Sequence, residues 1–173
     1  KYNNAHHELT AFSLDYNKLI STTTEFDEIR NNNPALYVSM RDQFVPSASY
    51  TFTYNTSANH RNPIWMQFSI KEAGNLTSAI YALGGQKFNK KDKELFNNPF
   101  AQYLKVTAEF HNHIKINNRL KFAYRLFGGV VYSYGNSSTA PYADQFYVGG
   151  ANSIRGFTVR GLGPGSYRST NAK

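Results

Sequence analysis

A histidine pair in an alternating stretch is the first place where this sequence could do chemistry. His111 and His113 are two residues apart, and Glu109 precedes them at the same spacing. In an extended strand all three side chains would lie on one face, and two imidazoles with a carboxylate can ligate zinc. His-x-His is also common on the polar face of a strand, and the sequence indicates no further ligand. We therefore predict no metal site and no cofactor.

Nucleophilic catalysis finds equally little support. The chain has no cysteine and no Gly-x-Ser-x-Gly elbow, and its Ser, His and Asp residues have no distinctive spacing. The lack of cysteine also excludes a disulfide scaffold and a thiolate zinc site. We predict that the chain is not an enzyme.

The charge of the chain suggests an anionic partner. The 173 residues carry a net charge of +8, and four lysines are concentrated in the segment QKFNKKDKE at 86–94. Such a segment could contact phosphate or lipid headgroups, although a solvated loop is the simpler interpretation. Nucleic acid is not favoured, because the aromatic residues of the strongest strands share a face with aliphatic residues and the charges lie opposite.

Alternation of apolar and polar residues is the strongest structural signal. It predicts an all-β chain with strands near 7–16, 47–57, 63–73, 101–116 and 119–134. The last two exceed the roughly 3–10 residues usual for globular strands. One of their faces is apolar and consists of Leu104, Val106, Ala108, Phe110, Phe122, Tyr124 and Leu126. The opposite face carries the ionisable residues Lys105, Glu109, His111, Lys121 and Arg125.

The connections between these strands alternate between long and short. They comprise residues 17–45, residues 57–62, residues 74–99, the pair Asn117-Asn118, and the tail from 135. Successive antiparallel strands place alternate connections at opposite ends of a sheet. One end would therefore hold short turns and the other long loops, which is typical of outer-membrane barrels. A soluble sandwich gives no reason for this segregation.

Three short helices are predicted in the long loops from their capping signals. The signals are a Thr22–Glu25 capping box, an Asn33-Pro34 pair opening a helix through Met40, and Asn75 capping a helix through Leu83 before Gly84-Gly85.

The most unusual stretch is the glycine-rich tail. It reads QFYVGGANSIRGFTVRGLGPGSY over 145–167 and holds six of the chain's 12 glycines. No Lys-Ser or Lys-Thr follows the glycines, so this is not a phosphate-binding loop. Glycines beside aromatic residues favour an ordered loop that packs closely against another surface.

Two segments of this tail carry a family resemblance. FYVGG at 146–150, followed by SIRGF at 153–157, resembles the signature of the outer-membrane protein assembly superfamily. That superfamily of surface-antigen-type barrels includes BamA, TamA and the two-partner secretion transporters. The motif residues would be Gly149, Gly150, Ile154, Arg155, Gly156 and Phe157. The long loops further resemble those of Bacteroidetes members.

The resemblance implies a 16-stranded transmembrane β-barrel in the outer membrane of a Gram-negative bacterium. Residues 1–173 would form part of that barrel, an antiparallel meander equivalent to its seventh to eleventh strands. The hallmark loop at 135–173 would be the sixth extracellular loop, which folds into the lumen. The lateral seam and the periplasmic POTRA domains would lie outside this chain.

The resemblance also implies roles for the motif residues. Arg155 would anchor the loop to the inner barrel wall, for which Glu109 is one candidate partner. Gly156 would allow close packing, and Phe157 would form an apolar wedge. The pair Gly149-Gly150 would bend the loop.

The implied function is assembly, insertion or translocation of other outer-membrane proteins. The implied partners are membrane lipid and lipopolysaccharide, unfolded outer-membrane protein substrates and accessory assembly subunits. The apolar strand faces would meet lipid, and the ionisable faces would meet the lumen. Two alternatives stay open at this point, namely a passive porin or transporter barrel and a soluble basic β domain that binds polyanions.

Overall fold

The computed structural model describes residues 4–32, 34–40, 42–56, 60–88, 93–95 and 98–160. The chain forms two compact units. One comprises Lys1–Tyr16 with Gln43–Ala140, and the other comprises Asn17–Asp42 with Pro141–Lys173. The final residues of the glycine-rich tail, 161–173, lie outside the described residues.

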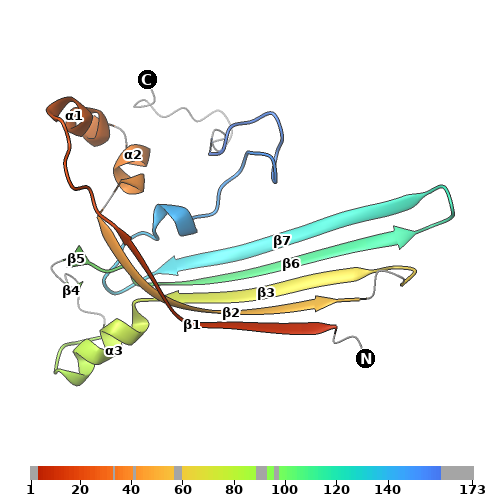
Figure 1. Ribbon diagram of the computed structural model, residues 1–173, viewed down its shortest axis with the longest axis horizontal. Helices are drawn as coiled ribbons and strands as arrows, with labels where there is room; N and C mark the ends of the chain where they lie inside the picture. The colour runs from red at the N-terminus through yellow and green to blue at the C-terminus, as the bar shows by residue number, and fades with distance from the viewer. Residues whose placement is uncertain are drawn as a thin grey trace. The chain divides into compact units, whose positions relative to one another are not determined.

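A five-stranded antiparallel meander dominates the first unit (Figure 1), which confirms the predicted fold class. The strands β1 to β3, β6 and β7 lie side by side in chain order, and β4 and β5 form a separate small pair. The strand bounds are β1 Ala5–Asn17, β2 Gln43–Asn55, β3 Ile64–Ala73, β4 Glu94–Leu95, β5 Asn98–Pro99, β6 Tyr103–Lys115 and β7 Lys121–Ser133.

Short helices interrupt the long connections. They are α1 (Thr24–Asn32), α2 (Pro34–Ser39), α3 (Asn75–Leu83) and the 3-10 helix η1 (Tyr142–Asp144). In the described part of the chain, no helix has the length and apolar character needed to span a bilayer.

Cross-strand register places the apolar residues of four strands on one face. Directly opposite partners in antiparallel strands point to the same side, and one such row is Phe52, Phe68, Ala108 and Gly128. The next row in one direction is Tyr54, Met66, Phe110 and Leu126, and in the other Tyr50, Ile70, Val106 and Val130. The alternation that the sequence shows strand by strand therefore adds up to a single apolar face across β2, β3, β6 and β7.

The two short turns lie at one end of the sheet, and α3 with the β4–β5 pair lies at the other (Figure 1). The turn between β6 and β7 is wider than predicted. It spans 116–120, and the Asn117 side-chain oxygen accepts the N–H groups of Arg119 and Leu120, both at 2.8 Å. A two-residue Asn117-Asn118 turn of type I′ would need positive φ at both residues. Among the described non-glycine residues only Arg160 has a positive φ.

The buried core sits at the long-loop end of the sheet. Its apolar cluster consists of Val45, Ala73, Ala101, Tyr103 and Ala140. Burial of Phe44 and Val45 explains why β2 begins at Gln43, before the expected residue 47.

A buried polar network surrounds this core and holds together segments far apart in sequence. Gln102 is fully buried, and its side-chain oxygen accepts the N–H of Asn136 at 3.0 Å. The Asn136 amide in turn donates to the carbonyls of Lys93, at 2.8 Å, and Phe100, at 2.9 Å. Buried polar groups are tolerated when they find such partners, so this network ties the β3–β6 connection to the residues after β7.

Lys93 is an exception to the interpretation of the lysine-rich segment as a solvated loop. Its side chain is only 2% exposed, and its ammonium donates to Ser78 Oγ at 2.9 Å and to the Phe88 carbonyl at 2.6 Å. Burial lowers the pKa of Lys93 below its ordinary value. Lys87 is exposed, whereas 89–92 lie outside the described residues.

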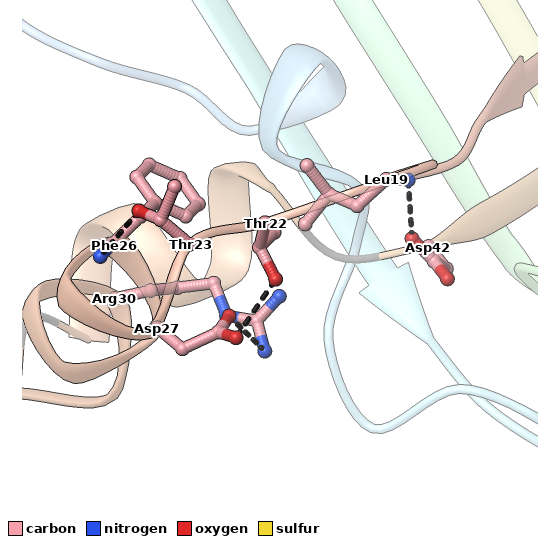
Figure 2. A network of polar contacts seen from close by, with 7 residues as sticks. All are labelled: Leu19, Thr22, Thr23, Phe26, Asp27, Arg30 and Asp42. Atoms are coloured by element: carbon pink, nitrogen blue, oxygen red, sulfur yellow. Dashed lines mark hydrogen bonds and ion pairs between the residues drawn. The ribbon is translucent and has the colours of Figure 1, made fainter.

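The helix termini differ from the predicted caps in two places. At α1 the N–H of Phe26 donates to Thr23 Oγ1 at 3.3 Å, while the Thr22 hydroxyl donates to Asp27 at 2.7 Å (Figure 2). Thr23 is thus the cap, and the predicted Thr22–Glu25 capping box is wrong. At α3 the capping position belongs to Gly74, with no side-chain cap. The proposed cap Asn33 lies outside the described residues.

Asn75 does not cap α3 because its side chain is used elsewhere. Its Oδ1 accepts the Tyr134 hydroxyl at 2.7 Å and the Gln102 amide at 3.4 Å. It is the first residue of the helix and belongs to the buried polar network.

Gly74→Ala should lower the free energy of unfolding by about 2–4 kcal/mol. Gly74 has φ 72°, and a Cβ there would lie 2.3 Å from the backbone oxygen of Ala101. Gly85→Ala is the matched control, because Gly85 has φ 86° with nothing within 4 Å of a new Cβ. Chemical denaturation should show a loss of only about 1 kcal/mol for that control, the cost of a side chain at positive φ without a steric clash. Equal losses in the two variants would refute a steric role for Gly74.

Candidate functional site

The described part of the glycine-rich tail, residues 145–160, is called the glycine-rich loop below. It folds back on itself in the second unit. The N–H of Arg160 donates to the Val148 carbonyl at 2.9 Å, and the N–H of Gly150 donates to the Phe157 carbonyl at 2.9 Å. Two segments, 148–150 and 157–160, are therefore hydrogen-bonded to each other. The four motif residues Ile154-Arg155-Gly156-Phe157, called the tetrad below, begin within the turn that joins these segments. In this turn the Ser153 N–H donates to the Gly150 carbonyl at 3.2 Å.

Glycine is required at 149 and 150 for two reasons. Both residues have positive φ angles, 102° and 89°, and residues with a side chain rarely adopt such a backbone conformation. A Cβ at Gly149 would also lie 2.2 Å from the Thr158 carbonyl oxygen, and one at Gly150 would lie 2.8 Å from a Val159 methyl group. The Gly-Gly pair thus lets the two segments come together.

Gly156 differs from that pair. Its φ is 88°, but a Cβ at this residue would meet no described atom within 4 Å, so conformation alone calls for glycine within the loop. Close packing of Gly156 against another part of a barrel stays a prediction.

Arg160 holds the base of the loop, a role that was not predicted from the sequence. Its guanidinium donates to Gln145 Oε1 at 3.2 Å and to the Tyr142 carbonyl at 2.5 Å. It also stacks over the Tyr142 ring, 3.6 Å from the centroid, and lies 5.2 Å from that of Tyr147. One residue thereby connects η1, the start of the motif and the segment after the tetrad. The one feature of the sequence that could have drawn attention to Arg160 is that Arg160-Gly161 repeats the pair Arg155-Gly156 five residues later.

The tetrad itself is presented to solvent in this unit. Arg155 is exposed, and it has no hydrogen-bond or ion-pair partner among the residues that the structure describes. Phe157 and Ile154 are 52% and 45% exposed. The loop therefore organises itself without Arg155, whose anchoring role stays a prediction.

Arg160→Lys should loosen the loop, because an ammonium cannot replace the planar fork that stacks on Tyr142 and reaches two acceptors at once. We expect chymotryptic cleavage after Tyr147 or Phe157 to become about tenfold faster, equivalent to losing about one charge-assisted hydrogen bond.

Arg119→Lys, in the short β6–β7 turn, is the matched control and should leave the cleavage rate unchanged. An Arg160→Lys loop as resistant to chymotrypsin as the wild-type loop would show that Arg160 does not hold it.

The ionisable strand face carries one connected cluster. Glu109 Oε1 accepts Arg125 Nε at 2.5 Å and lies 2.6 Å from His111 Nε2. The His111 ring also lies 4.6 Å from that of Trp65. The structure thus brings together three of the five residues predicted for this face.

The two predicted lysines lie apart from that cluster. Lys105 is opposite Lys71 and Val131, and Lys121 is opposite Lys115 at the short-turn end. No group of three or more His, Asp and Glu side chains in the described ranges could hold a metal ion. On this face Glu109 is engaged by both Arg125 and His111, whereas Lys105 and Lys121 each lie opposite another lysine.

The chain matches a known protein family. The family model described as the Omp85 superfamily domain matches residues 3–172, which covers the meander and the glycine-rich loop together. No curated protein and no solved structure shows a significant match to the chain.

Proposed function

Because the chain belongs to the Omp85 superfamily, we propose that it forms part of a β-barrel in the bacterial outer membrane. The barrel would assemble, insert or translocate other outer-membrane proteins. The observation that carries this proposal is the single apolar face across four strands, with side chains such as Leu126, Val130 and Tyr132 more than 60% exposed within the unit.

A lipid environment accounts for this face better than water does. In a bilayer the strands satisfy their backbone groups by pairing with one another, and the apolar side chains meet acyl chains. The opposite face would line the lumen with Lys105, Glu109, His111, Lys121 and Arg125. A Lys or Arg at the lipid-facing midplane would cost about 2–4 kcal/mol, and the register keeps all five away from the apolar face.

The glycine-rich loop would stabilise the barrel interior. Arg155 would anchor it to the inner wall, Phe157 would act as an apolar wedge, and Arg160 would keep its base closed. This role involves no enzymatic step. The partners would be unfolded outer-membrane proteins, accessory assembly subunits and, beside the long loops, lipopolysaccharide.

Depletion of the intact protein from its host tests this function. We expect the folded forms of several unrelated outer-membrane proteins to decline, and wild-type protein supplied from a plasmid to restore them. Heat-modifiability on gels separates folded from unfolded barrels. A host whose outer-membrane proteins stay fully folded while only solute uptake falls would contradict the proposal and point to a passive porin.

A further inference from the structure

A basic pocket lies at the short-turn end of the sheet. Its volume is about 460 Å³, and it opens between the residues that lead into β3 and the β6–β7 turn. Its ionisable lining residues are His60, Arg61, His113, Lys115 and Lys121. Neither the glycine-rich loop nor the Glu109 cluster contributes to it.

Hydrogen bonds beyond the regular ladder fix the two sides of this pocket to each other. The N–H of His113 donates to the Pro63 carbonyl at 3.3 Å, and the N–H of Lys115 donates to Asn62 Oδ1 at 3.2 Å. The backbone that carries the cations is therefore held in place, so their convergence is a property of the fold.

The charges in this pocket are uncompensated. Lys115 and Lys121 are directly opposite each other across β6 and β7, an arrangement of like charges that destabilises a strand pair. The sequence has no Asp or Glu in 55–64 or 112–123. Within the described ranges, neither lysine nor Arg61 has a carboxylate partner. The nearest carboxylate on β6, Glu109, is engaged by Arg125 and His111.

We propose that this pocket binds a phosphate group. An anion between Lys115 and Lys121 would remove their repulsion and would accept hydrogen bonds from Arg61 and the two imidazoles. The donors come from three directions: the residues before β3, the end of β6 and the start of β7. A tetrahedral phosphate can present several oxygens to such an arrangement at once, whereas a planar carboxylate offers two.

Two sources could supply the phosphate, namely a phospholipid headgroup or soluble phosphate. The lipid source rests on the proposed function, in which the strands cross a bilayer and their short-turn end lies near its surface. Lys115 and Lys121 belong to the face assigned to the lumen, so a headgroup would reach them at the short-turn rim of the barrel. Ile116 and Leu120 flank the lysines in the same turn and are 54% and 52% exposed. Cations beside exposed apolar side chains are suited to the headgroup region of an anionic membrane.

The test uses the intact protein in nanodiscs of phosphatidylcholine, with or without phosphatidylglycerol. Retained lipid is counted by native mass spectrometry, and inorganic phosphate is titrated calorimetrically. We expect Lys115→Gln/Lys121→Gln to weaken phosphate binding by about tenfold to thirtyfold. Lys87→Gln, an exposed lysine in the β3–β6 connection, is the control and should bind as wild type does. Because the exchanged side chains are exposed, the double variant should reconstitute normally.

The outcomes separate the two sources. Phosphatidylglycerol retention that millimolar phosphate does not displace identifies the headgroup, and displacement identifies soluble phosphate. Equal binding by wild type and double variant in both assays would overturn the inference while leaving the proposed function intact. Competition by an acidic peptide but not by phosphate would also overturn it, in favour of a protein partner. Failure of the wild-type protein to enter any bilayer would overturn both proposals.

Discussion

Ala108→Lys is expected to lower the free energy of unfolding of the complete barrel in a bilayer by about 2–4 kcal/mol. Ala108 lies near the middle of β6 on the apolar face, opposite Phe68 and Gly128. It borders a groove of about 500 Å³ lined mostly by apolar residues of β3, β6 and β7. A longer side chain therefore has room, and the expected loss comes from placing a charge against lipid. Denaturant titration of barrels folded into phosphatidylcholine vesicles measures it.

Two control variants separate the effect of the charge from that of side-chain size, and the effect of the apolar face from that of the opposite face. Ala108→Met adds a side chain of similar length without charge and should change stability by less than about 1 kcal/mol, since the groove accommodates it. Thr107→Lys places the same charge one residue away on the opposite face and should cost little. If Thr107→Lys were the more destabilising of the two lysine variants, the assignment of the faces to lipid and lumen would be reversed.

The sheet was predictable because its signal is local and repeated. Alternation along β3, β6 and β7 indicates two faces within each strand, and short turns require neighbouring strands to pair. The same local interpretation failed where a side chain had a distant partner. Asn75 has a good capping residue type, but the hydroxyl of Tyr134, 59 residues later, occupies its oxygen. Lys93 belongs to a basic segment and was therefore expected to be solvated, but in the fold its N–H donates to Asn136 and its ammonium donates to Ser78.

In the hallmark loop, too, the local features were predictable from the sequence and the contacts between distant residues were not. Its motif could be recognised from residue types alone, and the positive φ of Gly149 and Gly150 agrees with glycine's conformational freedom. The contacts of Arg160 with Tyr142 and Gln145, which close the base of the loop, could not be predicted from the sequence. They depend on Tyr142 and Gln145 being folded back to Arg160, and Arg160 itself has φ 61°, a conformation unusual for arginine.

Arg155→Ala in the intact protein is expected to release the loop and lower the yield of assembled outer-membrane proteins. Loss of a charge-assisted, bidentate contact costs about 1.5–3 kcal/mol, which shifts a docking equilibrium by about tenfold or more. Arg155→Lys should restore only part of the yield, because an ammonium lacks the planar five-donor fork. The measurement pairs the protease sensitivity of the loop with the amount of folded substrate recovered in depleted cells.

The comparison with Arg160→Ala makes this result interpretable. Arg160 makes its contacts inside the loop, to Tyr142, Gln145 and Tyr147, whereas Arg155 has no partner among the described residues. Removal of Arg160 should therefore expose the loop to protease by opening its base, even in a fragment without the rest of the barrel. Removal of Arg155 should do so only where the barrel wall is present. If Arg155→Ala left both loop protection and substrate assembly at wild-type levels in the intact protein, Arg155 would be an ordinary surface arginine, and the anchoring role would pass to the apolar residues around it.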